Sequence, residues 1–313
     1  MSGQRVAESS VWTQKELIER TAEYLQGKGV PTPRLDAELL LAHVLNCTRI
    51  QLYLNYDRPL STEELDAYRE LVRARGDRRP LAYLTGEVGF WDLDLFVDPG
   101  VLIPSPDTET LVEGILEGIK AIRQQLGAEA PVLVLELGSG SGAIPLAVCS
   151  AERGITWIGI ERSEAAMRVA VRNRKRHEAV QAPRNNRLLL VLGDRFEPVH
   201  PGWQPHLVVG NPPYIPTGTI DRLMPEVAKG EPRLALDGGG DGTRFQRYMM
   251  AYAATRMALG GRLLFEMGAE QERQLRQILG GHPELRALPV RKDLSGHPRV
   301  LQAERLNPAP SVG

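Results

Sequence analysis

Val132-Leu-Val-Leu-Glu-Leu137 is followed directly by Gly138-Ser-Gly-Ser-Gly142 and then by Ala143-Ile-Pro-Leu-Ala-Val148. The first run has the unbroken apolar character of a buried strand, and the last is typical of a buried helix. A strand, a glycine turn and a helix in this order begin the nucleotide-binding half of a doubly wound α/β sheet. Glycines let the backbone approach a ligand closely, and the helix N-terminus presents free N–H groups. We therefore expect the cofactor-binding loop at Gly138, Ser139, Gly140, Ser141 and Gly142.

A carboxylate stands where such a site needs one. The next apolar run, Thr156-Trp-Ile-Gly-Ile160, ends at Glu161, which lies 23 residues after Gly138. An acid about 20 residues after the glycine turn typically binds a ribose diol. The same glycine spacing occurs in sites for NAD and for S-adenosylmethionine, so the loop alone does not choose between these two ligands.

Asn211-Pro-Pro-Tyr214 is the second informative motif, and it follows the apolar run 206–210. Two prolines make the loop rigid and remove two backbone donors. The Asn211 side-chain oxygen and the Pro212 carbonyl can accept both hydrogens of one planar NH2 group, and Tyr214 offers a face for stacking. This amide cradle suits a nitrogen nucleophile held for attack. We assign Asn211, Pro212 and Tyr214 to catalysis, and these three with Pro213 to substrate binding.

Both motifs belong to a longer set of short sequence blocks that follow one another between Ala82 and Arg305. The blocks are Ala82-Tyr-Leu-Thr-Gly-Glu87, Phe90-Trp91, Phe96-Val-Asp98, Val101-Leu-Ile-Pro-Ser-Pro-Asp-Thr-Glu109, Glu136-Leu-Gly-Ser-Gly-Ser-Gly-Ala-Ile144, Gly193-Asp-Arg-Phe-Glu-Pro198, Asn211-Pro-Pro-Tyr214, Glu231-Pro-Arg-Leu-Ala-Leu236, Gly239-Gly-Asp-Gly242, Phe265-Glu-Met-Gly268 and Lys292-Asp-Leu-Ser-Gly296. In this set the chain resembles the HemK family of protein-(glutamine-N5) methyltransferases. The form of residues 103–109 is closest to the branch that modifies peptide chain release factors.

The resemblance implies a class I (Rossmann-like) methyltransferase sheet of seven strands with one antiparallel edge strand. It also implies S-adenosyl-L-methionine as methyl donor, S-adenosyl-L-homocysteine as product, no metal, and a release factor as protein partner. By the same resemblance, Asp194 and Arg195 lie at the adenine, while Asn211 also contacts the cofactor. Three positions depart from the family pattern: Ser105 replaces a common Arg, Glu136 a usual Asp, and Arg195 an aromatic residue or leucine.

The chain divides into three expected parts. Residues 1–80 carry capping boxes at Thr13/Glu16 and Ser61/Glu64 and apolar residues at helical spacing, which predict a small helical bundle. We assign substrate docking to this bundle. Residues 81–104 predict a connecting β-hairpin, and residues 105–313 the methyltransferase domain. Further strands are expected at 188–192, 206–210, 261–266, 286–290 and 300–304, and the long connection 216–242 is expected to cover the substrate.

The charge and the distribution of apolar residues argue against nucleic acid and membrane as partners. The net charge of −1 and the pI near 6.6 give no global electrostatic attraction to nucleic acid. No apolar run reaches transmembrane length, and residues 1–10 lack the apolar core of a signal peptide, so we expect a cytoplasmic protein with no membrane partner. Cys47 and Cys149 lie in helix-like apolar settings and are expected as separate thiols.

Two other functions fit parts of the sequence. An adenine-N6 nucleic-acid methyltransferase would use the same cradle for an exocyclic amine, but the charge and the small non-basic N-terminal region oppose it. An NAD-binding oxidoreductase or a nucleotide-sensing module would use the glycine loop and leave the cradle without a purpose. No Ser–His pair or metal-ligand spacing accompanies the cradle, so catalysis is expected to rest on positioning and electrostatics.

Overall fold

The computed structural model describes residues 12–181 and 184–306, which form two compact units. The first unit comprises the described part of Met1–Gly86 together with Pro225–Gly230, and the second comprises Glu87–Met224 with the described part of Glu231–Gly313. Within the described residues, no helix combines the length and apolar character that crossing a membrane requires.

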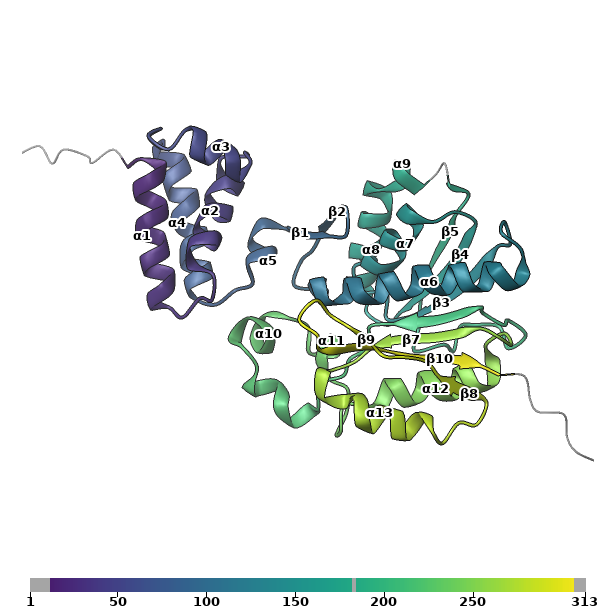
Figure 1. The fold of residues 1–313 in the computed structure, drawn as a ribbon. Helices are drawn as coiled ribbons and strands as arrows, with labels where there is room; N and C mark the ends of the chain where they lie inside the picture. Colours follow the sequence, from purple (N-terminus) through teal and green to yellow (C-terminus); the bar gives the residue numbers. More distant parts are fainter. Residues whose placement is uncertain (1–11, 182–183, 307–313) are drawn as a thin grey trace, which may run out of the picture. The chain divides into compact units, whose positions relative to one another are not determined.

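The first unit is a bundle of short helices around an apolar core. Its N-terminal helices α1, α2 and α4 pack on one another (Figure 1), and Leu17, Ile18, Leu40, Leu41 and Tyr68 are buried between them. The bundle is composed of α1 (Gln14–Gly27), α2 (Pro33–Val44), α3 (Arg49–Leu54), α4 (Thr62–Gly76), α5 (Leu81–Thr85) and α10 (Pro225–Gly230).

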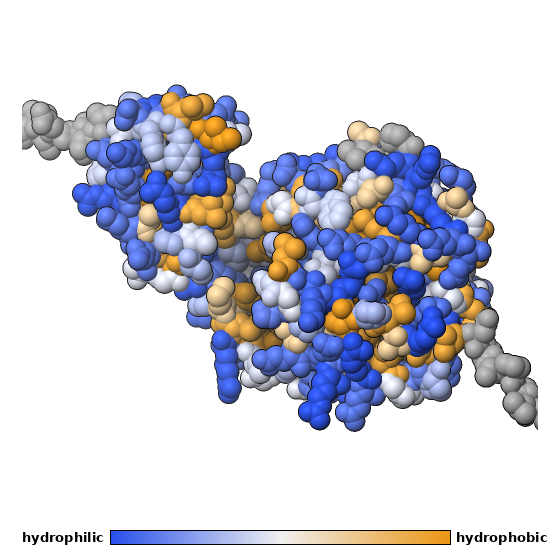
Figure 2. All heavy atoms as spheres, viewed as in Figure 1, coloured by the Kyte–Doolittle hydropathy of each residue, from blue (hydrophilic) through white to orange (hydrophobic). Residues whose placement is uncertain are grey.

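Both predicted capping boxes are confirmed at the starts of α1 and α4. A third box, in which Thr48 and Gln51 cap each other, begins the short helix α3, which the sequence analysis did not predict. Three large side chains are exposed on α3: Ile50, Tyr53 and Leu54. Figure 2 shows orange, hydrophobic spheres in the region of this helix.

The start of the predicted hairpin is helical, which corrects the expectation for residues 81–86. Leu81 and Leu84 of α5 pack against the apolar core of the bundle, which a helical turn allows and an extended strand would not. Gly86 ends the turn with φ +77°. The hairpin itself follows as β1 (Glu87–Phe90) and β2 (Leu93–Phe96), which pair antiparallel.

Helix α10 belongs to the bundle although it comes from the middle of the long connection 216–242. Arg78 donates through Nε and Nη2 to the two carboxylate oxygens of Glu226, each at 2.6 Å. Arg75 Nη1 donates to Glu226 Oε1 at 3.0 Å, and its Nε donates to Asp36 Oδ2 at 2.7 Å. Burial opposes the charge on Glu226, but the bonds from Arg78 and Arg75 outweigh it and lower the pKa of the carboxyl.

The second unit is built on a mixed sheet whose strands follow the order β5-β4-β3-β6-β7-β10-β8, with β9 also paired to β10. The strands from β5 to β7 are parallel, and β10 is antiparallel to its neighbours. Their bounds are β3 (Val132–Leu137), β4 (Ile155–Glu161), β5 (Arg187–Leu192), β6 (Leu207–Gly210), β7 (Arg262–Glu266), β8 (Leu285–Ala287), β9 (Arg291–Lys292) and β10 (Pro298–Arg305).

The antiparallel strand was expected at the edge of the sheet, and that expectation is wrong. Strand β10 lies inside the sheet, and the edge is occupied by β8, which pairs with β10. Strand β8 is also shorter than the predicted 286–290, since Pro289 has no N–H to donate to a ladder.

Helices cover both faces of the sheet (Figure 1), as in a doubly wound fold. Helices α6 (Glu109–Leu126) and α7 (Ala143–Ala151) share one apolar core with Val132 and Val134 of β3, while α12 (Arg244–Arg256) and α13 (Glu272–Leu279) share the other with Leu135 and Leu137. Successive strand residues point to opposite faces. The remaining elements are η1 (Pro106–Thr108), α8 (Glu164–Arg176), α9 (Glu178–Gln181), η3 (Thr217–Arg222), α11 (Arg233–Leu236) and η4 (Ala269–Gln271).

Candidate active site

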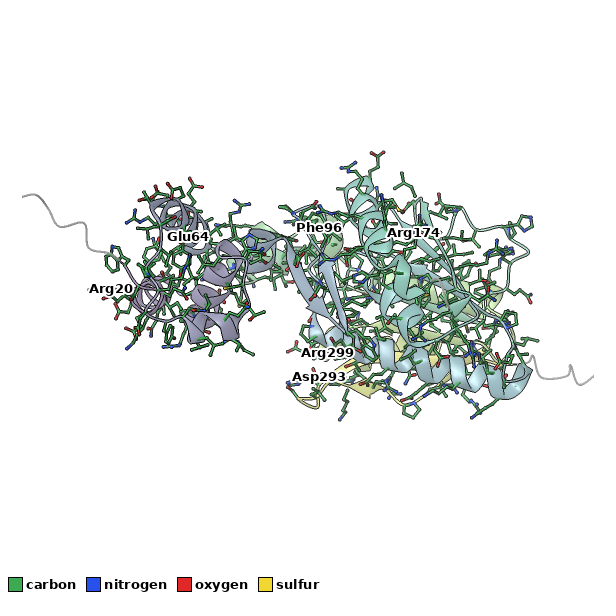
Figure 3. The ribbon with its side chains drawn as sticks, turned by 90° about the horizontal axis from the view of Figure 1, so that it is seen from above. Arg20, Glu64, Phe96, Arg174, Asp293 and Arg299 are labelled. Carbon is green, nitrogen blue, oxygen red and sulfur yellow. The ribbon has the colours of Figure 1, made fainter. Side chains whose placement is uncertain are left out.

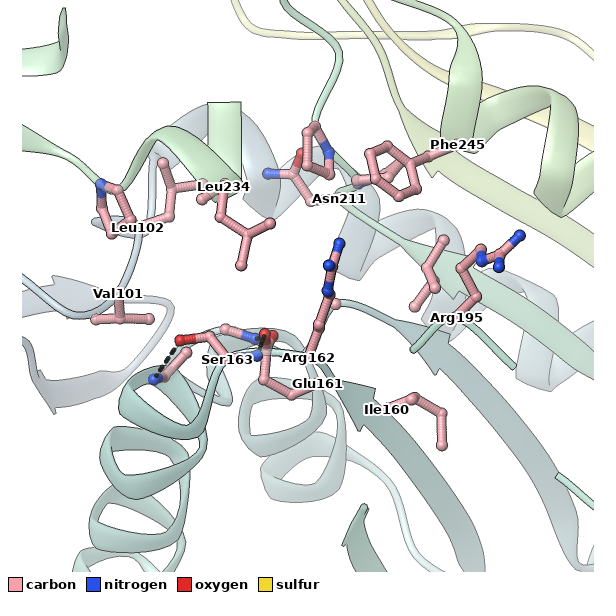
Figure 4. A pocket seen from close by; sticks show the side chains of 18 of the residues that line it. Val101, Leu102, Ile160, Glu161, Arg162, Ser163, Arg195, Asn211, Leu234 and Phe245 are labelled. Atoms are coloured by element: carbon pink, nitrogen blue, oxygen red, sulfur yellow. Dashed lines mark hydrogen bonds between the residues drawn. The ribbon is translucent and has the colours of Figure 1, made fainter. Parts of the chain in front are cut away.

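A pocket opens at the carboxyl ends of the parallel strands, where ligands bind in doubly wound folds. The space in and above it, open solvent included, amounts to about 830 Å³. In Figure 4, Leu234, Asn211 and Phe245 lie on one side of the pocket, and Glu161 and Ser163 lie on the other. Of the residues predicted from sequence, the pocket lining includes Gly138, Gly140, Glu161, Asp194, Arg195, Asn211, Pro212 and Pro213.

The glycine loop is shaped to leave room for a ligand. Gly138 has φ +76°, and a Cβ added there would meet no atom within 4 Å, so the absence of a side chain keeps the pocket open. Gly140 donates its N–H to Glu161 Oε2 at 2.9 Å, while Ser163 donates its N–H to Glu161 Oε1 at 2.7 Å. Glu161 therefore fixes the loop and the start of α8. A carboxylate has about four lone-pair sites, so acceptor capacity remains for ribose hydroxyls.

The other members of the predicted loop lie outside the lining of the pocket. Ser139 is buried and donates its hydroxyl to Glu136 Oε2 at 2.8 Å. The Ser141 carbonyl accepts from the side chain of Asn173, and Gly142 caps α7 with φ +81°. These three residues support the loop through their contacts beneath it, and their binding role remains a prediction.

Asp194 and Arg195, which the resemblance assigns to the adenine, follow β5 and line the pocket. Arg195 has φ +49°, and its guanidinium lies 3.4 Å from Asp194 Oδ2 and 2.9 Å from Glu197 Oε1. The same guanidinium lies 5.2 Å from the centre of the Tyr248 ring. Arg195 therefore forms a wall of the pocket through charge pairs and ring contact.

The amide cradle begins where β6 ends at Gly210. A Cβ at this glycine would come 2.7 Å from the Leu137 carbonyl, so only glycine lets the backbone turn here. Asn211 donates Nδ2 to the Thr108 hydroxyl at 3.1 Å. Its Oδ1 is buried and has no hydrogen-bond partner among the described residues. An unpartnered buried acceptor is costly in a folded protein, and this one belongs to a residue of the pocket lining.

Thr108 and Glu266 complete the cradle and were not predicted as site residues. Thr108 donates its hydroxyl to Glu266 Oε2 at 2.7 Å, and Tyr214 donates its hydroxyl to Glu266 Oε1 at 3.3 Å. Burial raises the pKa of Glu266 to about 7, against the bond from Thr108 and the charge of Arg299. A carboxylate at the carboxyl end of an apolar strand was a signal available in the sequence. Its pairing with a residue 158 positions away was not.

Tyr214 is not among the residues that line the pocket, and its hydroxyl donates to Glu266. Burial raises the pKa of this phenol, so it remains a hydrogen-bond donor at neutral pH. Its predicted stacking on the substrate is a role that these contacts leave open, whereas its bond to Glu266 places it in the support of the cradle.

Comparison with known proteins identifies the family. The family model described as the PrmC N-terminal domain matches residues 16–86. A release factor glutamine methyltransferase of Geobacter sulfurreducens is 42% identical over 262 residues, which cover 83% of this chain and 86% of that protein. A second one, of Rhodopirellula baltica, is 35% identical over 297 residues, covering 94% of this chain and 97% of that protein. The chain belongs to the release factor glutamine methyltransferase family.

The fold of this family member is the class I methyltransferase fold. The crystal structure of the hMettl16 catalytic domain in complex with MAT2A 3′UTR hairpin 6 is similar with a TM-score of 0.52, at 12% identity, over 82% of this chain and 87% of that one. At this identity the similarity concerns the fold alone.

Two departures from the family pattern have structural roles in this methyltransferase. Ser105 caps η1 by accepting the Asp107 N–H at 3.3 Å, and η1 carries Thr108 into the cradle. Glu136 is fully buried, and burial raises its pKa to about 7 although Trp157 and Ser139 donate to it.

Arg299 also contacts η1, through an ion pair with Asp107. Arg299 lies 2.8 Å from Asp107 Oδ2 and 2.8 Å from Asp293 Oδ2, and Figure 3 shows Asp293 and Arg299 side by side.

Among residues 12–181 and 184–306, no group of three or more His, Cys, Asp or Glu side chains could hold a metal ion.

Proposed function

We propose that this chain transfers a methyl group from S-adenosyl-L-methionine to the side-chain amide nitrogen (N5) of a glutamine in a peptide chain release factor. Family membership supports the reaction class. The observation that carries the proposal is the buried Oδ1 of Asn211, which has no partner among the described residues and lies at a pocket built for a cofactor.

The residues of the pocket fit the cofactor. The glycine loop leaves space beside the backbone at Gly138, and Glu161 and Asp194 supply carboxylates on the pocket wall, which suit hydroxyl and amine donors. The bound cofactor supplies a methyl group already activated on a sulfonium. Glu161 would hold its ribose hydroxyls, and Asp194 with Arg195 would flank its adenine.

The cradle overcomes the low reactivity of the substrate amide. An amide nitrogen is a poor nucleophile because its lone pair is delocalised into the carbonyl. We assign Asn211 Oδ1 as acceptor for one amide hydrogen and the Pro212 carbonyl as acceptor for the other. Two fixed acceptors hold the nitrogen for attack and stabilise the positive charge that develops on it.

The first unit carries none of the residues assigned to the pocket, and we assign to it the docking of the release factor. One glutamine must be selected from a much larger folded protein, and a second binding surface raises the effective concentration of that glutamine at the cradle. We also propose a cytoplasmic location for the enzyme and a role in translation termination, in which release factors act.

The test combines a transfer assay with mapping of the product. The purified chain is incubated with methyl-labelled S-adenosylmethionine and, in separate reactions, a release factor, a short glutamine peptide from it, and adenine-containing DNA and RNA. We expect label on one glutamine of the release factor, located by mass spectrometry. Label on adenine, with none on protein, would establish the adenine-N6 alternative instead.

A further inference from the structure

The Thr108 hydroxyl joins Asn211 to Glu266 and decides which way the Asn211 amide faces. A hydroxyl has one hydrogen to donate and two lone pairs that accept. The short contact of 2.7 Å commits the hydrogen of Thr108 to Glu266 Oε2. Thr108 can then only accept from Asn211, so the group that faces it at 3.1 Å must be the NH2 of Asn211.

The bond to Thr108 also determines which atom of the Asn211 amide faces away from Thr108. With Nδ2 bonded to Thr108, the carbonyl oxygen Oδ1 points away and remains free as a buried acceptor. If the amide turned over, its NH2 would face the NH2 of a substrate amide, and two donors would meet with no acceptor between them. Only one of the two orientations forms a working cradle.

We propose that Thr108 and Glu266 are positioning residues that hold Asn211 with its oxygen toward the substrate nitrogen. This inference rests on the proposed function, since the orientation matters only for a substrate that donates hydrogens. Neither residue touches the substrate in this scheme. Both act through Asn211, and the pocket lining includes Asn211 but neither Thr108 nor Glu266.

The relay requires Glu266 in its ionised form. A carboxylate only accepts, so it draws the Thr108 hydrogen to itself, whereas a protonated carboxyl can donate to Thr108. Thr108 would then be free to donate to Asn211 Oδ1 and turn the amide over. The groups that act on Glu266 besides Thr108 are Tyr214, which donates to it, Arg299, whose charge favours ionisation, and Asp107, whose charge opposes it.

The sign of the pH effect follows from these contacts. Burial raises the pKa of Glu266 to about 7, so the ionised form that orients Asn211 is lost as the pH falls through about 7. The acid limb should be seen in kcat/KM, which reports the ionisation of the free enzyme. Burial raises the pKa of Glu136 and of Glu231 to about 7 as well, so substitution of Glu266 alone is needed to assign the limb.

The first test compares Thr108→Val with Thr108→Ser on the short glutamine peptide. Valine keeps the shape and removes both hydrogen bonds, so the Asn211 NH2 loses its buried acceptor; we expect kcat to fall by about 10- to 100-fold, the cost of one such unpaired group. Serine keeps the hydroxyl and should recover most of the rate. The affinity for S-adenosylhomocysteine, measured by calorimetry, should fall less than kcat in Thr108→Val, since Thr108 touches the assigned cofactor contacts only through Asn211.

A readout without turnover separates orientation from general damage. The side-chain NH2 of Asn211, assigned through the loss of its NMR signals in Asn211→Asp, should exchange slowly with water in the wild type and faster in Thr108→Val. A full kcat in Thr108→Val, or a loss in it that Thr108→Ser does not restore, would overturn the relay.

The second test is the pH profile of Glu266→Gln. Glutamine does not titrate, so the acid limb of kcat/KM near pH 7 should disappear, whatever the height of the plateau. An unchanged limb in this variant would show that another group titrates and that Glu266 has no positioning role. Failure of the proposed function looks different: the wild-type enzyme would then methylate no glutamine at any pH.

Discussion

Removing the Asn211 acceptor should slow methyl transfer far more than it weakens cofactor binding. In Asn211→Ala, one of the two amide hydrogens of the bound glutamine loses its acceptor while the nitrogen gains positive charge. A hydrogen bond to a charged group contributes about 1.5–3 kcal/mol. Oδ1 is buried, so water cannot replace it, and the cost lies at the upper end of that range. We expect turnover to fall by about 10²-fold or more.

The assay is a single-turnover transfer of labelled methyl to the glutamine peptide, with S-adenosylhomocysteine affinity measured in parallel. Asn211→Asp is the matched control, since it keeps the size of the side chain. Its second oxygen would face the Thr108 oxygen, whose hydrogen is committed to Glu266, so this variant should be slow as well. Turnover of the alanine variant close to that of the wild type would remove the basis of the mechanism.

Three further expectations concern the cofactor, the bundle and the sheet. Glu161→Ala should weaken S-adenosylmethionine and S-adenosylhomocysteine alike by about 10- to 100-fold in calorimetry; tight NAD binding with no affinity for either ligand would refute the cofactor assignment. A chain that starts at Leu81 loses the arginines that pair with Glu226, so it should also carry Glu226→Gln. We expect this variant to bind S-adenosylhomocysteine and to methylate the short peptide normally, but to methylate intact release factor far more slowly. Equal rates on both substrates would exclude docking by the bundle. Gly159→Ala places a Cβ 2.1 Å from Ser139 Oγ and should lower the free energy of unfolding by about 1–3 kcal/mol; adding Ser139→Ala should recover part of that loss in thermal denaturation, and strictly additive effects would contradict the clash.

The sequence predicted the parts of the fold that are encoded locally. The apolar run at Val132–Leu137, the glycine turn after it and the capping boxes of α1 and α4 each depend on a few neighbouring residues, and all appear in the structure. The order of strands near the carboxyl end was harder. Short runs such as Leu285–Ala287 carry little pattern, and the place of β10 inside the sheet depends on pairing with β7 and β8.

The sequence likewise predicted only those site residues that are marked by a local pattern. Asn211, Glu161 and Asp194 follow strand ends, where the fold requires ligand contacts, and all three line the pocket. Thr108 and Glu266 could not be paired from sequence, because their contact joins segments 158 positions apart in the chain. The packing of α10 on the bundle could not be predicted for the same reason. It depends on the bonds of Arg75 and Arg78 to Glu226, and the sequence around Glu226 gives no sign of these partners.

The origin of α10 has a mechanical consequence. The polypeptide passes between the two units three times: after Gly86, before Pro225 and after Gly230. The bundle is therefore joined to the second unit by three covalent connections and not by a single linker. Only two residues beyond Gly230, the chain begins to line the cofactor pocket at Pro232. The backbone that leaves α10 therefore runs directly into the wall of the pocket. If the bundle docks the release factor as proposed, this short stretch is a covalent path between the docked partner and the bound cofactor.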